Sequence, residues 1–231
     1  MGMFDGKTIV VTGATGNLGV AVSRHLADEG ATLILMARNK VAVAELAKQL
    51  GASHTAITVD LADPDATMAT GSTLPPVDAI AALAGGFAMG KTVLQTNAND
   101  WQAMRDINVQ TMLNVIAAFV PKMIERRAGK IVTVGAAAAQ SGKAKMGPYI
   151  AAKSEVMRIT ETLAAELGPY GINVNSVLPT VIDTPQNRTA MPKADPSHWV
   201  APQSLAAFIA FLMSPQAEAI NGALIPVAGR T

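Results

Sequence analysis

The sequence contains no cysteine, little charge and no long uninterrupted apolar run. Without cysteine there is no disulfide, no thiolate nucleophile and no cysteine-ligated zinc, and three scattered histidines (His25, His54 and His198) do not make a metal site. No stretch reaches the roughly 18 consecutive apolar residues that a membrane-spanning helix needs, and the first residues carry no targeting pattern. We therefore expect no metal, no membrane contact and a soluble, cytoplasmic protein.

The few charges that are present nearly cancel. Lysine plus arginine (18) and aspartate plus glutamate (17) give a formal net charge of +1 and a pI near 8.0. No broad field therefore attracts nucleic acid or an anionic membrane, and we expect no nucleic-acid partner. Half of the residues are hydrophobic and only 15% are charged, against a usual charged fraction of about 25%. This composition predicts a large core and leaves apolar surface for a partner subunit.

The 231 residues fit one domain, residues 1–231, in which short β-branched runs alternate with segments of helical spacing. That alternation predicts an α/β fold with a Rossmann-type, doubly wound parallel sheet of about seven strands. The expected strands are residues 8–11, 32–36, 56–59, 77–83, 130–134, 172–177 and 223–227.

Two long helices are expected, at about residues 99–126 and 148–167, besides shorter ones after the first strand and at residues 41–50 and 202–213. The first long helix is apolar nearly all round, including Phe119 and Met123, so we expect a homodimer or homotetramer through the two long helices. Residues 180–200 lack periodicity and follow the carboxyl end of a strand, where open α/β sheets bind ligands. We interpret them as a substrate loop.

A glycine-rich turn, Thr12-Gly-Ala-Thr-Gly-Asn-Leu-Gly19, joins the first strand to a helix. Glycines in this context allow backbone N–H groups at a helix N-terminus to approach a pyrophosphate. The turn predicts a dinucleotide site, and its candidate binding residues are Gly13, Thr15, Asn17, Leu18 and Gly19.

The second strand ends in Ala37-Arg38, where an NAD-specific site would place an acid against the ribose hydroxyls. Arg38 offers a planar fork for a 2′-phosphate, so NADP(H) is preferred and NAD(H) remains possible. Asp60, followed by Leu61, is interpreted either as an acceptor for the adenine amino group or as a turn acid.

Tyr149 and Lys153 are spaced i and i+4, which places both side chains on one helix face. A cation beside the phenol is expected to lower the tyrosine pKa and make Tyr149 a usable proton donor. Ala84-Gly85-Gly86, after the fourth strand, would let a flat ring lie close to the backbone.

Together with Asn108 and Pro179, these motifs make the chain resemble the short-chain dehydrogenases/reductases from end to end. The resemblance implies NAD(P)(H) binding, with Tyr149 as acid/base, Lys153 holding the nicotinamide ribose and Asn108 supporting a proton-relay water. By the same resemblance Ala84, Gly85, Gly86, Tyr149, Lys153, Pro179, Ile182 and Thr184 bind the cofactor.

Two positions depart from the usual family pattern. The catalytic serine would stand thirteen residues before the tyrosine, where this chain has Ala136, and the middle glycine of the turn is Gly16 instead of residue 17. Both departures occur in the quinoid dihydropteridine reductase branch, which residues 182–199 also resemble in their Asp-Thr-Pro, Asn-Arg, Met-Pro, Ala-Asp and Trp elements. A conjugated quinonoid ring accepts hydride readily, so a polarising serine is dispensable for it.

The sequence thus supports three readings. The first is an NAD(P)H-dependent short-chain reductase that transfers hydride to a quinonoid dihydropterin or a similar flat conjugated small-molecule acceptor. The second is a general carbonyl reductase or alcohol dehydrogenase of the same family. The third is a non-catalytic NADPH-binding regulator, against which the presence of Tyr149, Lys153 and Asn108 argues.

Overall fold

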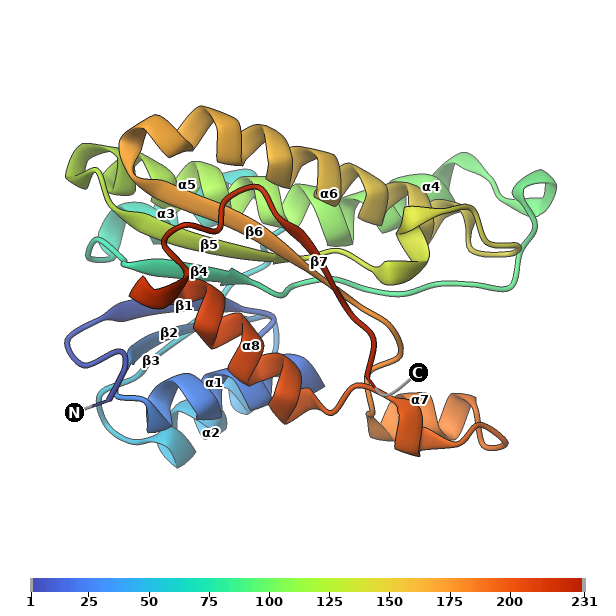
Figure 1. Ribbon diagram of the computed structural model, residues 1–231, viewed down its shortest axis with the longest axis horizontal. Helices are drawn as coiled ribbons and strands as arrows, with labels where there is room; N and C mark the ends of the chain where they lie inside the picture. The colour runs from blue at the N-terminus through green and yellow to red at the C-terminus, as the bar shows by residue number, and fades with distance from the viewer. Residues whose placement is uncertain (1, 230–231) are drawn as a thin grey trace.

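Seven parallel strands form one twisted sheet in the computed structural model, which describes residues 2–229 (Figure 1). The strand order is β3-β2-β1-β4-β5-β6-β7, with the crossover between β1 and β4 that is typical of a doubly wound fold. The strands are β1 (Thr8–Thr12), β2 (Thr32–Ala37), β3 (Thr55–Thr58), β4 (Ala79–Ala82), β5 (Gly129–Val134), β6 (Ile172–Pro179) and β7 (Leu224–Val227). The predicted fold class is confirmed.

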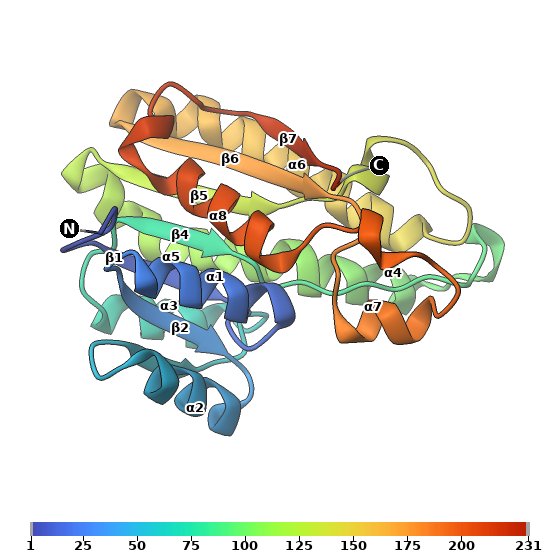
Figure 2. The same ribbon diagram turned by 60° about the horizontal axis from the view of Figure 1, so that its bottom comes forward.

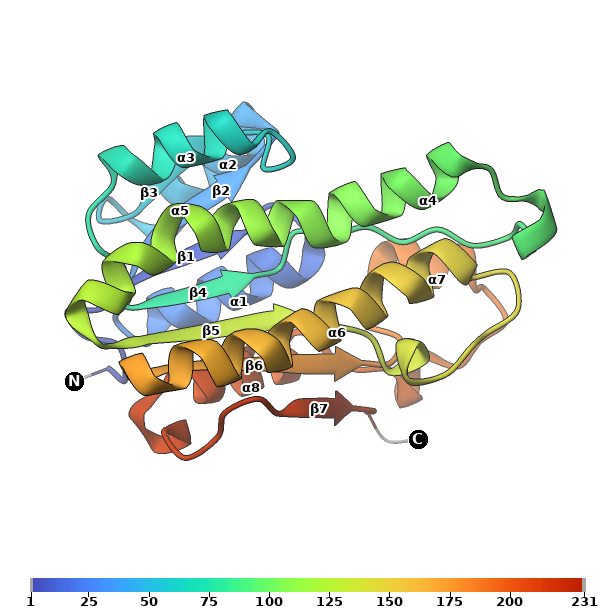
Figure 3. The same cartoon turned by 90° about the horizontal axis from the view of Figure 1, so that it is seen from above.

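Helices cover both faces of this sheet, which explains why the central strands are apolar on both sides (Figures 1 and 3). One face packs against α1 (Asn17–Asp28), α2 (Lys40–Leu50) and α8 (Pro202–Met213). The other packs against α3 (Pro64–Thr73), α5 (Thr111–Arg126) and α6 (Gly147–Leu167). Residues of β1 and β4 belong to both cores. The packing of these two strands therefore positions the loops that follow their carboxyl ends.

The long helix predicted at residues 99–126 consists of α4 (Ala98–Arg105), one π-helical turn (Asp106–Gln110) and α5. By length and composition it would be able to cross a membrane, but most of its apolar window is buried against the sheet. Phe119 and Met123 are 2% and 0% exposed within a single chain. These two side chains therefore belong to the core of the chain itself, and the expected homodimer or homotetramer stays a prediction.

Two helices were not expected. The first is α3, whose sequence is rich in threonine, serine and glycine, but Asp63 caps it through the Ala66 N–H and Pro64 occupies its first turn. The second is α7 (Pro185–Ala190), which lies inside the interval predicted to be a loop. Residues 180–200, called the substrate segment below, thus carry a short helix at the carboxyl edge of the sheet (Figure 2).

Candidate active site

A cavity of about 870 Å³ opens at the carboxyl ends of the strands. Its wall contains every residue that the sequence predicts to bind the cofactor: Gly13, Thr15, Asn17, Leu18, Gly19, Arg38, Asp60, Leu61, Ala84, Gly85, Gly86, Tyr149, Lys153, Pro179, Ile182 and Thr184. These residues come from six separate parts of the chain, so the fold brings them together in one place. The roles assigned to them individually stay predictions.

Residues 12–19, called the phosphate-binding turn below, end in the exposed N-terminus of α1. Gly13 has φ +61°. A Cβ on Gly19 would lie 2.2 Å from the carbonyl oxygen of Gly13, so only glycine fits at position 19. Gly16 is the N-cap and provides no side-chain acceptor. The first N–H groups of α1 therefore lack helical partners and face the cavity as donors for an anion. This geometry fits the diphosphate of a dinucleotide.

The far end of the cavity carries the residues that would meet the adenosine half of a dinucleotide. Ala37 is buried, and Arg38 is exposed and has no ion-pair partner among residues 2–229. Asn39 caps α2 through the Ala42 N–H, which fixes the direction of the chain after β2. Asp60 accepts a hydrogen bond from the Ala62 N–H over 3.1 Å, so one of its oxygens stabilises the turn. Asp60 thus acts as a turn acid in the structure, and its contact with the adenine amino group stays a prediction.

Lys153 is buried in the floor of the cavity. Its Nζ donates to the carbonyl oxygen of Val134 over 2.8 Å, and burial lowers the pKa of the ammonium from 10.5 to about 8. A Cβ on Gly85 would lie 3.2 Å from the same Nζ. The absence of a side chain at Gly85 therefore leaves space for the ammonium group of Lys153 at the cavity.

Tyr149 stands one helical turn before Lys153 and meets the ring of Phe87 edge to face, with centroids 4.8 Å apart and an interplanar angle of 77°. Burial raises the pKa of the Tyr149 phenol to about 12. The expectation that Lys153 lowers this pKa is not met, because desolvation of the phenolate outweighs any effect of a lysine that is itself desolvated. Tyr149 is consequently a neutral phenol throughout the neutral range, and its role as the acid/base stays a prediction.

Asn108 lies beneath the cavity and is absent from its wall. It occupies the π-helical turn, where its Oδ1 accepts from the Gly86 N–H over 3.1 Å and its Nδ2 donates to the Met104 carbonyl over 2.9 Å. Single π-helical turns often occur at functional sites. Here the turn aims the amide at the glycine loop after β4 and holds that loop in position. The water-relay role implied by the family resemblance stays a prediction.

The wall of the cavity contains no serine among the described residues. Ala136 is 4% exposed, and Ser141, five residues further along the chain, is exposed at the surface. Thr133 is fully buried and its Oγ1 bonds the Thr160 hydroxyl over 2.8 Å. Within residues 2–229, neither Ser141 nor Thr133 therefore replaces the missing serine beside Tyr149.

Several lining residues were not predicted. Ala103, Asp106, Ile107 and Thr111 form one stripe along the long helix, at spacings of three and four residues. Leu83 follows β4, Val134 and Gly135 stand at the carboxyl end of β5, and Phe87 follows the two glycines. The helical spacing and the strand ends were visible in the sequence, whereas the contact of Phe87 with Tyr149 depends on the fold.

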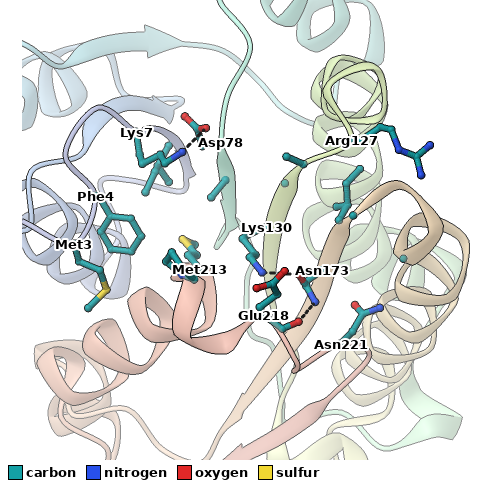
Figure 4. Close-up of a pocket in the computed structure, with 18 residues that line it drawn as sticks. Met3, Phe4, Lys7, Asp78, Arg127, Lys130, Asn173, Met213, Glu218 and Asn221 are labelled. Carbon is teal, nitrogen blue, oxygen red and sulfur yellow. Dashed lines mark hydrogen bonds and ion pairs between the residues drawn. The ribbon is translucent and has the colours of Figure 1, made fainter.

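A second cavity, of about 530 Å³, lies at the opposite, amino-terminal edge of the sheet (Figure 4). Its lysines already have partners in the chain, because Lys7 pairs with Asp78 and Lys130 donates to Asn173. Its walls hold none of the residues that sequence analysis assigns to cofactor or catalysis. We therefore place the active site at the carboxyl edge.

Comparison with known proteins agrees with this geometry. A family model described as short chain dehydrogenase matches residues 7–195. The chain is 31% identical over 243 residues to a galactitol 2-dehydrogenase (L-tagatose-forming) of Cereibacter sphaeroides, over 97% of this chain and 94% of that protein. It is 27% identical over 236 residues to a 3-oxoacyl-(acyl-carrier-protein) reductase of Vibrio harveyi, over 97% of each chain.

The fold comparison points the same way. A solved structure described as a short chain dehydrogenase/reductase family protein superimposes with a TM-score of 0.92 at 29% identity, over 98% of this chain and 97% of that chain. The family match spans most of the sequence and the structural match nearly all of it. The chain therefore belongs to the short-chain dehydrogenase family and is an NAD(P)-dependent oxidoreductase.

Proposed function

We propose that this protein is an NADP(H)-preferring reductase that delivers hydride to a flat, already electrophilic conjugated acceptor of the quinonoid dihydropterin type. The observation that carries the proposal is Ala136, together with the absence of any serine from the described wall of the cavity. A ketone needs a hydrogen-bond donor to stabilise the oxyanion that develops on its oxygen during hydride attack. A quinonoid ring spreads the incoming electron pair over its conjugated system and needs no such donor.

Bound NADPH would supply the hydride, and the chain's own groups supply the proton and the orientation. The reduced acceptor needs one proton to become neutral, and Tyr149 carries that proton because its pKa is about 12. The glycines at 85 and 86 provide a surface without side chains on which a flat ring can lie. Phe87, whose ring edge meets Tyr149, gives that surface an aromatic border.

Carbonyl reduction is the second candidate, and the relatives favour it. The Vibrio harveyi and Cereibacter sphaeroides proteins are named as a 3-oxoacyl reductase and a galactitol dehydrogenase, both of which act at a carbonyl or alcohol carbon. This chain retains the tyrosine and lysine such a reaction uses, but it replaces the serine. We rank the candidate second because its oxyanion would lack the hydroxyl donor.

Oxidation of NADPH, followed at 340 nm against quinonoid dihydropterin and a panel of simple ketones, separates the two candidates. We expect turnover with the quinonoid acceptor and much slower turnover with ketones. Efficient ketone reduction without quinonoid reduction would overturn the proposal in favour of carbonyl reduction. NADPH binding without oxidation by any acceptor would indicate a regulator instead.

A further inference from the structure

The phosphate-binding turn and the substrate segment touch each other, although the residues in contact are 169 positions apart. Asn17 is the first residue of α1, and Gln186 lies in α7. The Nδ2 of Asn17 donates to the Oε1 of Gln186 over 2.6 Å. Figure 2 shows α7 beyond the amino-terminal end of α1, on the side where the strands end. The contact therefore spans the edge of the cavity.

Hydrogen bonds connect the residues on either side of Gln186 to one another and to residues of the cavity wall. Thr184 Oγ1 accepts from the Asn187 N–H over 3.1 Å, and Asn187 Nδ2 donates to the Ile182 carbonyl over 2.8 Å. Arg188 pairs with Asp183 through two hydrogen bonds of 2.6 and 2.8 Å. Ile182 and Thr184 themselves line the cavity. These bonds join α7 and the lining residues into one unit.

An anion at the N-terminus of α1 would lie immediately beside Asn17, because that end presents the uncapped N–H groups. We propose that Gln186 is a positioning residue that ties the substrate segment to the phosphate-binding turn and retains the dinucleotide beneath it. The inference rests on the placement of the cofactor in the proposed function. Because coupling between two equilibria is reciprocal, the bound dinucleotide should in turn strengthen the contact between α7 and the phosphate-binding turn.

Stopped-flow fluorescence tests the first half of this inference through the dissociation rate of NADPH. Loss of one hydrogen bond of ordinary strength predicts that Gln186→Ala speeds dissociation by about three- to tenfold. Asn17→Ala/Gln186→Ala should release NADPH no faster than Asn17→Ala alone, because both changes remove the same contact. The matched control is Gln203→Ala, an exposed glutamine on α8 that does not line the cavity, and it should leave the rate unchanged.

Limited proteolysis tests the second half without any turnover. Trypsin has targets at Arg188 and Lys193, both exposed in the substrate segment. NADPH should slow cleavage there in the wild type and in Gln203→Ala, and should protect Gln186→Ala much less. Equal release rates and equal protection in Gln186→Ala and wild type would overturn the inference. A wild type that fails to bind NADPH at all would instead overturn the proposed function.

Discussion

The ammonium group of Lys153 lies 2.8 Å from the carbonyl oxygen of Val134, at the carboxyl end of β5. This bond fixes the lysine on the floor of the cavity at the cost of its hydration, which is why the pKa of Lys153 falls to about 8. A site that needs a cation in this position therefore lowers the stability of the fold. Tyr149, one turn earlier, is desolvated by the same packing, and its pKa rises to about 12.

The first prediction concerns Lys153→Met. The unfolded lysine, with its ordinary pKa of 10.5, binds more protons than the folded one between pH 8 and 10.5, so the stability of the wild type rises with pH across this window. One pKa unit corresponds to about 1.4 kcal/mol. From pH 7 to pH 10, the unfolding free energy of the wild type should therefore rise by about 2 kcal/mol relative to that of Lys153→Met. Urea denaturation at the two pH values measures this shift. Parallel pH profiles would show that the lysine is not desolvated.

The second prediction concerns Arg38, which is exposed beside the cavity and has no ion-pair partner in the described chain. A bidentate bond to the 2′-phosphate predicts that Arg38→Ala weakens NADPH binding by about ten- to a hundredfold and leaves NADH binding nearly unchanged. Titration calorimetry with both cofactors measures this, with Arg24→Ala on α1 as the control. A wild type that binds NADH as tightly as NADPH would refute the prediction, and Arg38 would then point into solvent.

The sequence predicted the parts of the site that depend on local geometry. Strand, glycine turn and helix follow one another along the chain, and the i, i+4 spacing of Tyr149 and Lys153 places both on one face of α6. Features that depend on distant contacts were missed. One is the close approach of α3 to α5 at Gly71, where a Cβ would lie 2.8 Å from the Cβ of Ala118. Another is the π-helical turn that aims Asn108 at the glycine loop, because no periodicity in the sequence predicts such a turn.

The third prediction concerns the assembly. We expect a homodimer or homotetramer through α5 and α6, on the basis of the low charge and the length of these apolar helices. Ala117 is the informative position because it is exposed on α5, whereas Phe119 and Met123 are buried in the core. Ala117→Glu should lower the mass measured by light scattering without unfolding the chain, since a carboxylate would be desolvated in the interface. Met123→Glu should unfold it.

Three further results decide this prediction. The control is Ala44→Glu, an exposed position on α2 on the other side of the sheet, and it should leave the mass unchanged. A wild type that is monomeric at micromolar concentration would contradict the prediction outright. An oligomer that tolerates Ala117→Glu would place the interface elsewhere.

The last prediction returns to Ala136 and separates proton delivery from carbonyl polarisation. Ala136→Ser would place a hydroxyl near Tyr149, but a conjugated acceptor develops little localised charge for it to stabilise. Reduction of quinonoid dihydropterin should therefore stay within several-fold of wild type, while reduction of ketones should rise.

Tyr149→Phe removes the proton donor and should lower quinonoid turnover by about tenfold to ten-thousandfold, and by less where solvent protonates the reduced ring. Steady-state kcat and KM for both acceptors, measured with each variant and with Ala136→Ser/Tyr149→Phe, supply the comparison. A large gain in quinonoid turnover from Ala136→Ser alone would mean that localised charge on this acceptor limits the reaction, and it would contradict the premise that a conjugated acceptor needs no hydroxyl donor.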